Sequence, residues 1–171
     1  MIIWITGLPG SGKTTLARNL KSILEKKLPN NIVILDGDNI RRILPYQIAY
    51  SNEDRMKLAF FYSKLALLIE QSNCIVICSF VALFHSVQEY TRLNANDYFE
   101  IFLDPSLDEL VKINKKDLYS DGSDYMLNQF TKHEFPKYPD LRVNSIINGI
   151  YQDNLAEIKD KLYRKFKILD K

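Results

Sequence analysis

Runs of apolar residues alternate along the chain with stretches whose apolar positions repeat at the helical spacing. The first run, MIIWIT, predicts a strand buried on both faces that ends at a glycine-rich loop. In residues 13–27 the apolar side chains fall on one helical stripe, which comprises Leu16, Leu20, Ile23 and Leu24. Further strands are predicted over residues 31–36, 74–80, 98–104 and 141–145, and further helices over residues 54–71, 106–113 and 151–165.

This order of elements favours an α/β fold. Strands linked by right-handed helical crossovers form a doubly wound parallel sheet with helices on both faces. We expect about five strands in a single domain over residues 1–171, because the chain shows no internal repeat or linker. Residues 114–139 form a polar segment without periodicity. Such segments in compact domains are commonly lids or binding loops, so we predict a lid there.

The composition is typical of a globular domain. Of the 171 residues, 46% are hydrophobic and 26% charged, and a net charge of +2 gives no reason to expect a nucleic-acid or membrane partner. Apolar runs such as residues 75–84 are too short to span a bilayer. The apolar N-terminus lacks a basic flank, so we expect no signal peptide and a cytoplasmic protein. Cys74 and Cys78 are interpreted as buried reduced thiols, since the two histidines supply no metal-binding pattern.

The strongest chemical signal is GLPGSGKT, residues 7–14, between the first strand and the first helix. This is the spacing of a P-loop, in which backbone N–H groups and a helix N-terminus hold nucleotide phosphates. Lys13 can reach the outer phosphates, and the Thr14 hydroxyl can bind Mg²⁺. We therefore predict a P-loop NTPase fold. The predicted nucleotide-binding residues are Gly7, Pro9, Gly10, Ser11, Gly12, Lys13, Thr14 and Thr15.

A small GTPase is the first alternative that this loop raises. Residues 114–117, NKKD, match the N-K-x-D pattern that reads guanine. A GTPase also needs an aspartate three residues before a glycine that senses the γ-phosphate, and no glycine of this chain follows an aspartate at that distance. NKKD also opens the polar segment instead of closing an apolar strand. We therefore reject the GTPase interpretation.

A second polar group, LDGDNIRR, follows the second predicted strand at residues 35–42. Ligands of doubly wound sheets bind at the carboxyl ends of strands, so Asp36 and Asp38 should face the same crevice as the P-loop. Phosphoryl transfer needs Mg²⁺ and a carboxylate that orients and deprotonates the attacking hydroxyl, and Arg41 could grip a phosphate of the acceptor. The alternative is a solvated turn, for which Asp-Gly-Asp-Asn is also typical. Beside a P-loop, the pattern favours a kinase.

Together these motifs resemble the adenylylsulfate kinase family, P-loop kinases that use ATP to phosphorylate the ribose 3′-hydroxyl of adenosine 5′-phosphosulfate. GLPGSGKTTLA, LDGDNIRR, SNEDR, DLY and QFTK…PDL occur in the family's order and approximate spacing up to about Ser145. The resemblance implies ATP and Mg²⁺ as cofactors. It also implies catalytic roles for Asp38 and Lys13 and a metal site at Thr14 and Asp36.

The resemblance further implies an acceptor site. Two arginines of the chain correspond to those that hold the acceptor's 5′ phosphates, and two aromatic residues to the rings that stack on its base. A lysine and a tyrosine correspond to the family's K-G-L-Y element in the lid. The aromatic residues could instead be core, and the lysine could be solvated. The predicted acceptor-binding residues are Asp36, Asp38, Arg41, Tyr50, Arg55, Phe80, Val81, Lys116, Tyr119 and Phe130.

The chain departs from the family on the acceptor side. Six positions differ from the family's pattern. The family has polar or cationic residues at four of them, a proline at one and the glycine of K-G-L-Y at another. In this chain these positions are Leu58, Ala82, Leu83, His85, Ile113 and Asp117. Losing hydrogen-bond donors around a substrate changes substrate selection by orders of magnitude. Some family members phosphorylate cytidine diphosphoramidate, on the route to phosphoramidate-decorated capsular polysaccharide. A phosphoramidate is less acidic than a sulfate and offers N–H donors, so we favour this acceptor over adenosine phosphosulfate.

Two other classes stay open. A nucleotide-binding protein without catalysis would tolerate an altered acceptor half, although Lys13, Thr14, Asp36 and Asp38 are all present. A kinase for a sugar or shikimate-like acceptor would not need two rings to clamp a base. By analogy with the family, we expect a homodimer that acts on a small-molecule nucleotide acceptor, without nucleic-acid or membrane partners.

Overall fold

The computed structural model describes residues 1–26, 31–45, 51–113, 117–120, 132–144 and 152–166. Within these residues lies a five-stranded parallel sheet with the strand order β2-β3-β1-β4-β5. The strands are β1 (Ile2–Gly7), β2 (Ile32–Asp36), β3 (Ile75–Phe80), β4 (Tyr98–Leu103) and β5 (Leu141–Val143). Because all of them run in the same direction, their carboxyl ends meet at one edge, where such sheets bind ligands.

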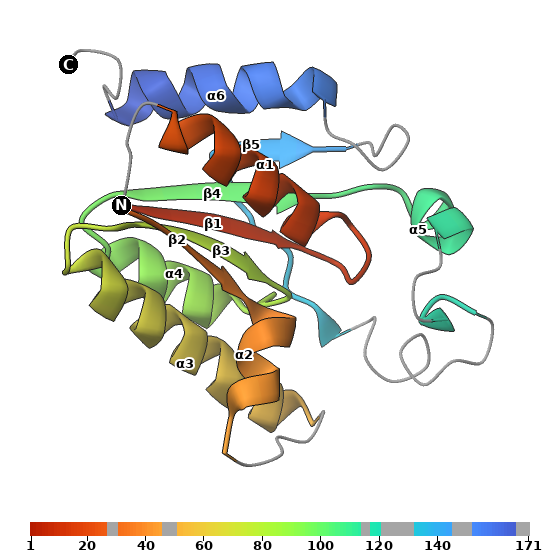
Figure 1. Cartoon of the computed structure of the whole chain (residues 1–171). Helices are drawn as coiled ribbons and strands as arrows, with labels where there is room; N and C mark the ends of the chain where they lie inside the picture. The colour runs from red at the N-terminus through yellow and green to blue at the C-terminus, as the bar shows by residue number, and fades with distance from the viewer. Residues whose placement is uncertain (27–30, 46–50, 114–116, 121–131, 145–151, 167–171) are drawn as a thin grey trace.

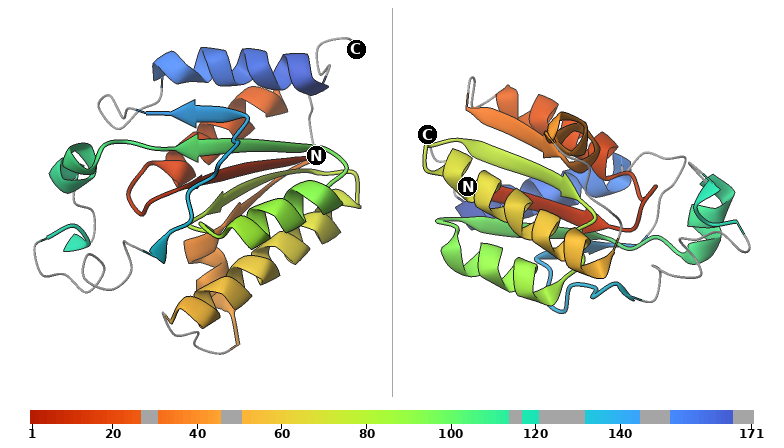
Figure 2. Two further views of the ribbon diagram at one scale, coloured as in Figure 1. Left: turned by 180° about the vertical axis from the view of Figure 1, so that it is seen from behind. Right: turned by 90° about the horizontal axis from the view of Figure 1, so that it is seen from below.

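Helices cover both faces of the sheet (Figure 1). α1 (Lys13–Glu25) and α6 (Gln152–Phe166) lie on one face, and α3 (Asn52–Glu70) and α4 (His85–Asn94) lie on the other. The same three layers can be followed from behind and from below in Figure 2. Two short helices, α2 (Gly37–Ile43) and α5 (Leu107–Ile113), follow the carboxyl ends of β2 and β4. The predicted doubly wound α/β fold is confirmed.

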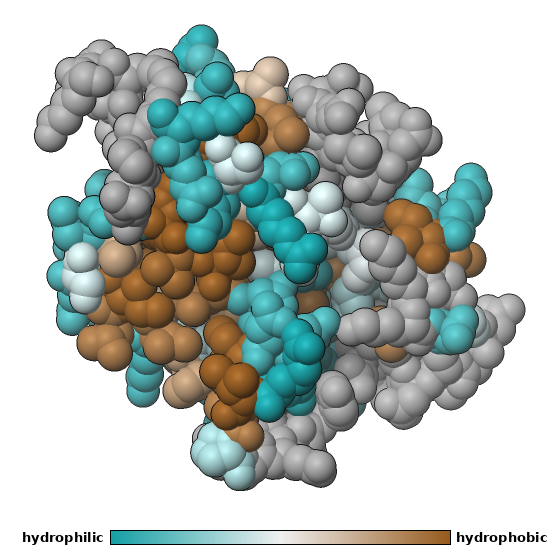
Figure 3. Space-filling view, viewed as in Figure 1, coloured by the Kyte–Doolittle hydropathy of each residue, from teal (hydrophilic) through white to brown (hydrophobic). Residues whose placement is uncertain are grey.

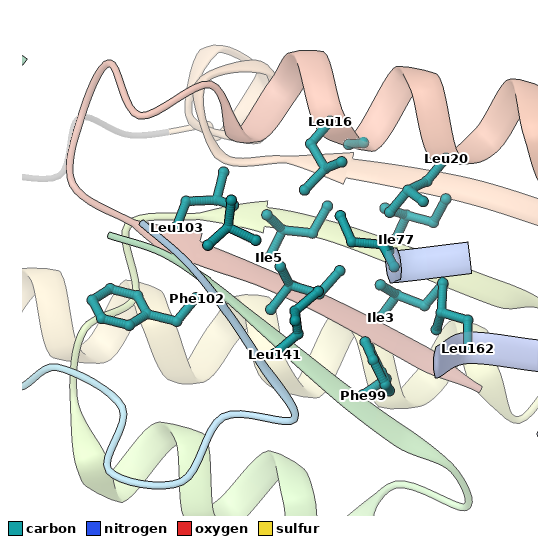
Figure 4. Packing of buried hydrophobic residues seen from close by; sticks show 14 of the residues in the cluster. Ile3, Ile5, Leu16, Leu20, Ile77, Phe99, Phe102, Leu103, Leu141 and Leu162 are labelled. Carbon is teal, nitrogen blue, oxygen red and sulfur yellow. The ribbon is translucent and has the colours of Figure 1, made fainter. Parts of the chain in front are cut away.

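Alternating side chains along β1 build a separate core on each face of the sheet. Ile3 and Ile5 pack with Leu16 of α1 in one core (Figure 4). Trp4, between them, belongs to the other core, where its ring lies 5.1 Å from that of Phe80. Burial on both faces explains why β1 is a continuous apolar run in the sequence.

Helices α2 and α4 are absent from the sequence-based prediction. The Asp36 carboxylate accepts hydrogen bonds from the backbone N–H groups of Asp38 (3.1 Å) and Asn39 (3.2 Å), and this cap starts α2 where a turn was the alternative. In α4, polar residues such as Gln88 take buried positions, so the helix lacks a clear apolar stripe. Both helices therefore depend on contacts that periodicity does not report.

The two cysteines are free thiols, as predicted. Cys78 is buried, but Cys74 precedes β3 and is only half-buried. Among the described residues, no group of three metal-binding His, Cys, Asp or Glu side chains is found. No described helix is long and apolar enough to cross a membrane.

The surface carries some large apolar side chains. Phe61 and Leu68 of α3 are 42% and 62% exposed, and Leu93 of α4 is 76% exposed. Figure 3 shows apolar surface concentrated on one side of the visible face, the side on which the N-terminus lies in Figure 1.

Candidate active site

The P-loop joins the carboxyl end of β1 to α1 in a conformation that needs glycine. Gly10 and Gly12 have φ angles of 79° and 87°, in the left-handed region that other residues rarely adopt. At Gly7, an added Cβ would lie 2.4 Å from the carbonyl oxygen of Leu103 in β4. The predicted glycine spacing therefore builds a tight turn directly ahead of the positive end of α1, where phosphate binding is favoured.

The Lys13 side chain folds back over the P-loop and is buried. Its Nζ donates to the backbone carbonyl oxygens of Gly7 (3.0 Å) and Leu8 (2.7 Å) and to Oγ of Ser11 (3.5 Å). The ammonium group is thus held against the loop that is predicted to bind the nucleotide phosphates. Phosphate oxygens are stronger partners for an ammonium than carbonyl oxygens, so a nucleotide can take over these contacts.

Thr14 connects the P-loop to the ends of β2 and β3. Its Oγ1 donates to Oδ2 of Asp36 at 2.7 Å and lies 3.4 Å from Oγ of Ser79. Asp36 and Ser79 face each other in the register of β2 and β3. Carboxylate and hydroxyl oxygens are the ligands that Mg²⁺ prefers, together with water and phosphate. The donor set therefore fits Mg²⁺, and Thr14 and Asp36 would hold it.

The first turn of α2 presents Asp38, the predicted catalytic carboxylate. Asp38 is exposed and Arg41, three residues later, is half-buried, whereas Asp36 is buried beneath them. Tyr62 of α3 donates a hydrogen bond to the carbonyl oxygen of Gly37 at 3.2 Å. Burial raises the pKa of Tyr62 to about 12, and the nearby Arg41 guanidinium opposes this shift. Tyr62 therefore supports the start of α2 from the core as a neutral donor.

Arg55, predicted to bind the acceptor, lies in the first turn of α3. Its Nη2 is 3.0 Å from Nδ1 of His133, and its guanidinium carbon is 5.7 Å from the centre of the Phe84 ring. A guanidinium can only donate, so Nδ1 accepts and the proton of the neutral imidazole is on Nε2. Burial lowers the pKa of His133 to about 4, and the charges of Arg55 and Lys13 add to the shift. His133 is therefore neutral near pH 7.

Part of the predicted lid is fastened to the start of α4. The backbone N–H of Glu134 donates to the carbonyl oxygen of Leu83 at 3.0 Å. The Glu134 carboxylate accepts from the backbone N–H of His85 at 2.6 Å, and Nε2 of His85 lies 2.9 Å from the carbonyl oxygen of Phe135. His85 is the first residue of α4, where a negative charge stabilises the helix. Residues 134 and 135 therefore belong to the body of the domain.

The other described part of the predicted lid, residues 117–120, packs on the P-loop. Tyr119 is 4% exposed, and its hydroxyl donates to the carbonyl oxygen of Pro9. Asp117 has a φ of 50°, in the left-handed region. It stands where the family's K-G-L-Y element has glycine, and aspartate tolerates this backbone better than most residues. This departure from the family is thus accommodated locally.

The apolar departures from the family lie inside the cores. Leu58 and Ala82 belong to the core under α3 and α4, and Leu83 belongs to the core on the opposite face. Phe80 is 1% exposed and stacks on Tyr62 with ring centres 4.3 Å apart. The structure thus gives Phe80 a packing role, and its contact with the acceptor stays a prediction.

The remaining predicted residues fall into two groups. Thr15 and Val81 are half-buried, in the first turn of α1 and directly after β3. Tyr50, Lys116 and Phe130 lie outside the described residues.

Three residues at this edge were missed by sequence reasoning: Ser79, Tyr62 and His133. Ser79 could have been predicted from the sequence, because it is a polar residue at the carboxyl end of a buried strand, where ligands bind. Tyr62 lies within an apolar helix that gave no such signal. His133 meets Arg55 across 78 residues of sequence, and no local pattern reports that contact.

Comparison with known proteins agrees with this geometry. A sequence profile of the family described as Adenylylsulphate kinase matches residues 1–144. The cytidine diphosphoramidate kinase of Campylobacter jejuni is 29% identical over 164 residues, which cover 96% of this chain and 95% of that protein. The adenylyl-sulfate kinase of Prochlorococcus marinus is 36% identical over 158 residues, which cover 89% of this chain and 78% of that protein.

A solved structure extends the likeness to three dimensions. The APS kinase CysC of Mycobacterium tuberculosis, in complex with AMPPNP and APS, matches with a TM-score of 0.77 and 26% identity, over 94% of this chain and 96% of that one. Relatives with either acceptor in their names are similarly distant, so the likeness establishes the kinase chemistry and leaves the acceptor open. This chain belongs to the adenylylsulphate kinase family and is an ATP- and Mg²⁺-dependent phosphotransferase that acts on a hydroxyl group.

Proposed function

We propose that this kinase phosphorylates the ribose 3′-hydroxyl of a nucleotide with a 5′-phospho-conjugate, and that its acceptor is cytidine diphosphoramidate. The observation that carries the proposal is a contrast within the site. Lys13, Thr14 and Asp36 keep the nucleotide half intact, whereas at Leu58 and Ala82 the chain has buried apolar side chains where the family resemblance predicts polar acceptor-site residues. A less acidic 5′ group suits such a site, and the C. jejuni relative with this activity in its name spans almost the whole chain.

The residues divide the work of transfer. Lys13 would balance the charge on the transferred phosphoryl group. Thr14 and Asp36 would hold Mg²⁺, which would supply further charge neutralisation at the phosphates. Asp38 accepts the proton of the 3′-hydroxyl while its oxygen bonds to the γ-phosphorus. The bond from the γ-phosphorus to the bridging oxygen breaks, and ADP leaves.

The acceptor nucleotide would lie across Arg41 and Arg55, whose guanidinium groups suit its 5′ phosphates. Tyr50 and Phe130 are proposed to stack on its base. Such stacking tolerates any base and does not select cytosine over adenine. Tyr119 and Lys116 are proposed to contact the bound acceptor from the lid over residues 114–139.

Two alternatives are tested with this proposal. Adenylylsulfate kinase activity is the first alternative, because the P. marinus relative of that name is similar to this chain as well, at 36% identity. A catalytically silent nucleotide-binding protein is disfavoured, because the predicted catalytic and phosphate-binding residues Lys13, Thr14, Asp36 and Asp38 are all present.

One transfer assay tests these possibilities. Purified protein with ATP and Mg²⁺ is offered cytidine diphosphoramidate and adenosine phosphosulfate in parallel, and the products are identified by mass. Phosphorylation of the cytidine compound alone supports the proposal. Phosphorylation of the adenosine compound alone overturns the proposed acceptor and leaves the parent activity. If neither is phosphorylated although ATP binds, the proposed function fails.

We further propose a homodimer, as expected by analogy with the family. The exposed apolar side chains of Phe61 and Leu68, seven residues apart on α3, are compatible with a protein interface. Light scattering after gel filtration tests this, and a mass of one 20.0 kDa chain would contradict it. The cytoplasmic location stays a prediction from the sequence.

A further inference from the structure

The imidazole of His133 joins two parts of the site that are far apart in the sequence. Its Nδ1 accepts a hydrogen bond from Nη2 of Arg55 at 3.0 Å. Lys13 of the P-loop lies near enough for its charge to act on the same ring. His133 therefore contacts the proposed acceptor half and lies within range of the Lys13 charge in the nucleotide half.

The support of His133 is rigid. The next residue, Glu134, is bound through its backbone to Leu83 at 3.0 Å and through its carboxylate to the first residue of α4 at 2.6 Å. The side-chain amide of Gln88 also donates to the carbonyl oxygen of Glu134 at 3.3 Å. An imidazole on such a support can hold a long, flexible partner in one position.

Arg55 is the partner whose side chain is ordered by this support. An arginine side chain has many rotamers, and ordering it when a ligand binds weakens the binding. Here the guanidinium is contacted at one N–H by His133 and over the face of the Phe84 ring, 5.7 Å away. These contacts order the guanidinium before the acceptor arrives.

The chemical type of the partner also matters. A carboxylate at this position would hold Arg55 equally well, but its negative charge would compete with the phosphates of an acceptor. A neutral imidazole accepts a hydrogen bond and adds no negative charge. The pairing is therefore suited to an arginine that must bind an anion.

We propose that His133 is a positioning residue for acceptor binding, which fixes the Arg55 guanidinium toward the acceptor's 5′ phosphates without adding a negative charge beside it. This inference rests on the proposed function in one respect, namely that Arg55 binds an anionic acceptor.

Three substitutions of His133 test the proposal by steady-state kinetics, with the acceptor that the transfer assay identifies as a substrate. His133→Asn keeps a neutral acceptor atom, His133→Leu removes it, and His133→Asp replaces it with a charged one. We expect His133→Leu to raise the acceptor KM about 10- to 100-fold, the range for a lost hydrogen bond to a charged group. His133→Asp should raise it similarly, and His133→Asn should restore it to within about threefold of wild type. The KM for ATP should change little in all three variants.

Three outcomes would overturn the proposal. Equal acceptor KM values in wild type and His133→Leu would show that Arg55 needs no support. An increase in His133→Asn as large as in His133→Leu, or an equal loss of ATP binding, would indicate a structural role. Thermal unfolding of each variant identifies a folding defect, and the Asn variant keeps the test valid if His133→Leu does not fold.

A second readout does not need turnover. Nitrogen NMR of the imidazoles, without acceptor, should show His133 with an unprotonated Nδ1 and a protonated Nε2 at pH 7. The chain has two histidines, so a His85→Asn variant assigns the signals. A proton on Nδ1 would overturn the proposed pairing with Arg55. If the NMR result holds while the wild-type protein phosphorylates neither acceptor, the proposed function has failed and the pairing has not.

Discussion

At the scale of single residues, Asp36 and Asp38 lie two positions apart but in different environments. Asp36 is buried, caps α2 and accepts a hydrogen bond from Thr14 at 2.7 Å. Asp38 is exposed in the first turn of α2. We therefore propose the buried carboxylate as the metal ligand and the exposed one as the base for the acceptor hydroxyl.

Replacing Asp38 with asparagine tests the proposed division of roles. We expect Asp38→Asn to lower the transfer rate by about two to four orders of magnitude, because the amide cannot accept the proton. ATP binding, measured by calorimetry, should stay nearly unchanged. Transfer at the wild-type rate would remove Asp38 from the role of general base.

Gly7 and Gly10 differ in what surrounds them. An added Cβ at Gly7 would lie 2.4 Å from the carbonyl oxygen of Leu103, whereas at Gly10 the nearest atom, in Tyr119, is 3.9 Å away. We expect Gly7→Ala to destabilise the fold by about 2–4 kcal/mol through clash and strain. Gly10→Ala, which adds only backbone strain, should cost about 1 kcal/mol. Urea unfolding measures both, and equal losses would contradict the role of the Leu103 contact.

At the scale of elements, α2 depends on its cap. Its sequence contains Gly37 and Asp38 at the start, which also suit a turn. The Asp36 carboxylate satisfies two of the N–H groups that a helix N-terminus leaves without partners. The same residue therefore caps the helix and is the proposed metal ligand.

Two variants separate these roles of Asp36. Asparagine caps helices as well as aspartate does, so Asp36→Asn should change the free energy of unfolding by less than about 0.5 kcal/mol, whereas Asp36→Ala should lower it by about 1 kcal/mol. Loss of the charge should raise the Mg²⁺ concentration needed for half-maximal transfer about tenfold in both. An unchanged Mg²⁺ requirement in Asp36→Asn would exclude Asp36 from the metal site.

At the scale of the whole molecule, stability in mild acid should depend on His133. Burial and the charges of Arg55 and Lys13 lower its pKa from 6.5 to about 4 in the folded protein. As the pH falls below 6.5 the unfolded chain takes up a proton first, so the stabilisation from the neutral ring is complete above pH 6.5 and is lost as the pH approaches 4. Unfolding free energies of wild type and His133→Asn should therefore converge over this range. A constant difference would contradict the lowered pKa.

The network around Arg92 ties the layers together at a distance from the site. Arg92 of α4 bonds to Glu100 of β4 at 2.8 Å, and its guanidinium also lies 3.5 Å from Asp140, just before β5. Burial raises the pKa of Glu100, and the Arg92 charge opposes the shift. These contacts join α4 to β4 and to the residue before β5.

The parallel sheet and the P-loop could be predicted from the sequence, because both depend on local patterns of residues. Strands buried on both faces are continuous apolar runs, and the left-handed turns at Gly10 and Gly12 need glycine at fixed spacing. The rest of the site could not be predicted in this way, because it depends on contacts between residues far apart in the sequence. Thr14 contacts Ser79, which is 65 residues away in the sequence, and Arg55 contacts His133, which is 78 residues away. Crossover connections bring such distant segments to the same edge of the sheet. Periodicity reports which face of an element is buried, but not which distant side chain lies opposite it.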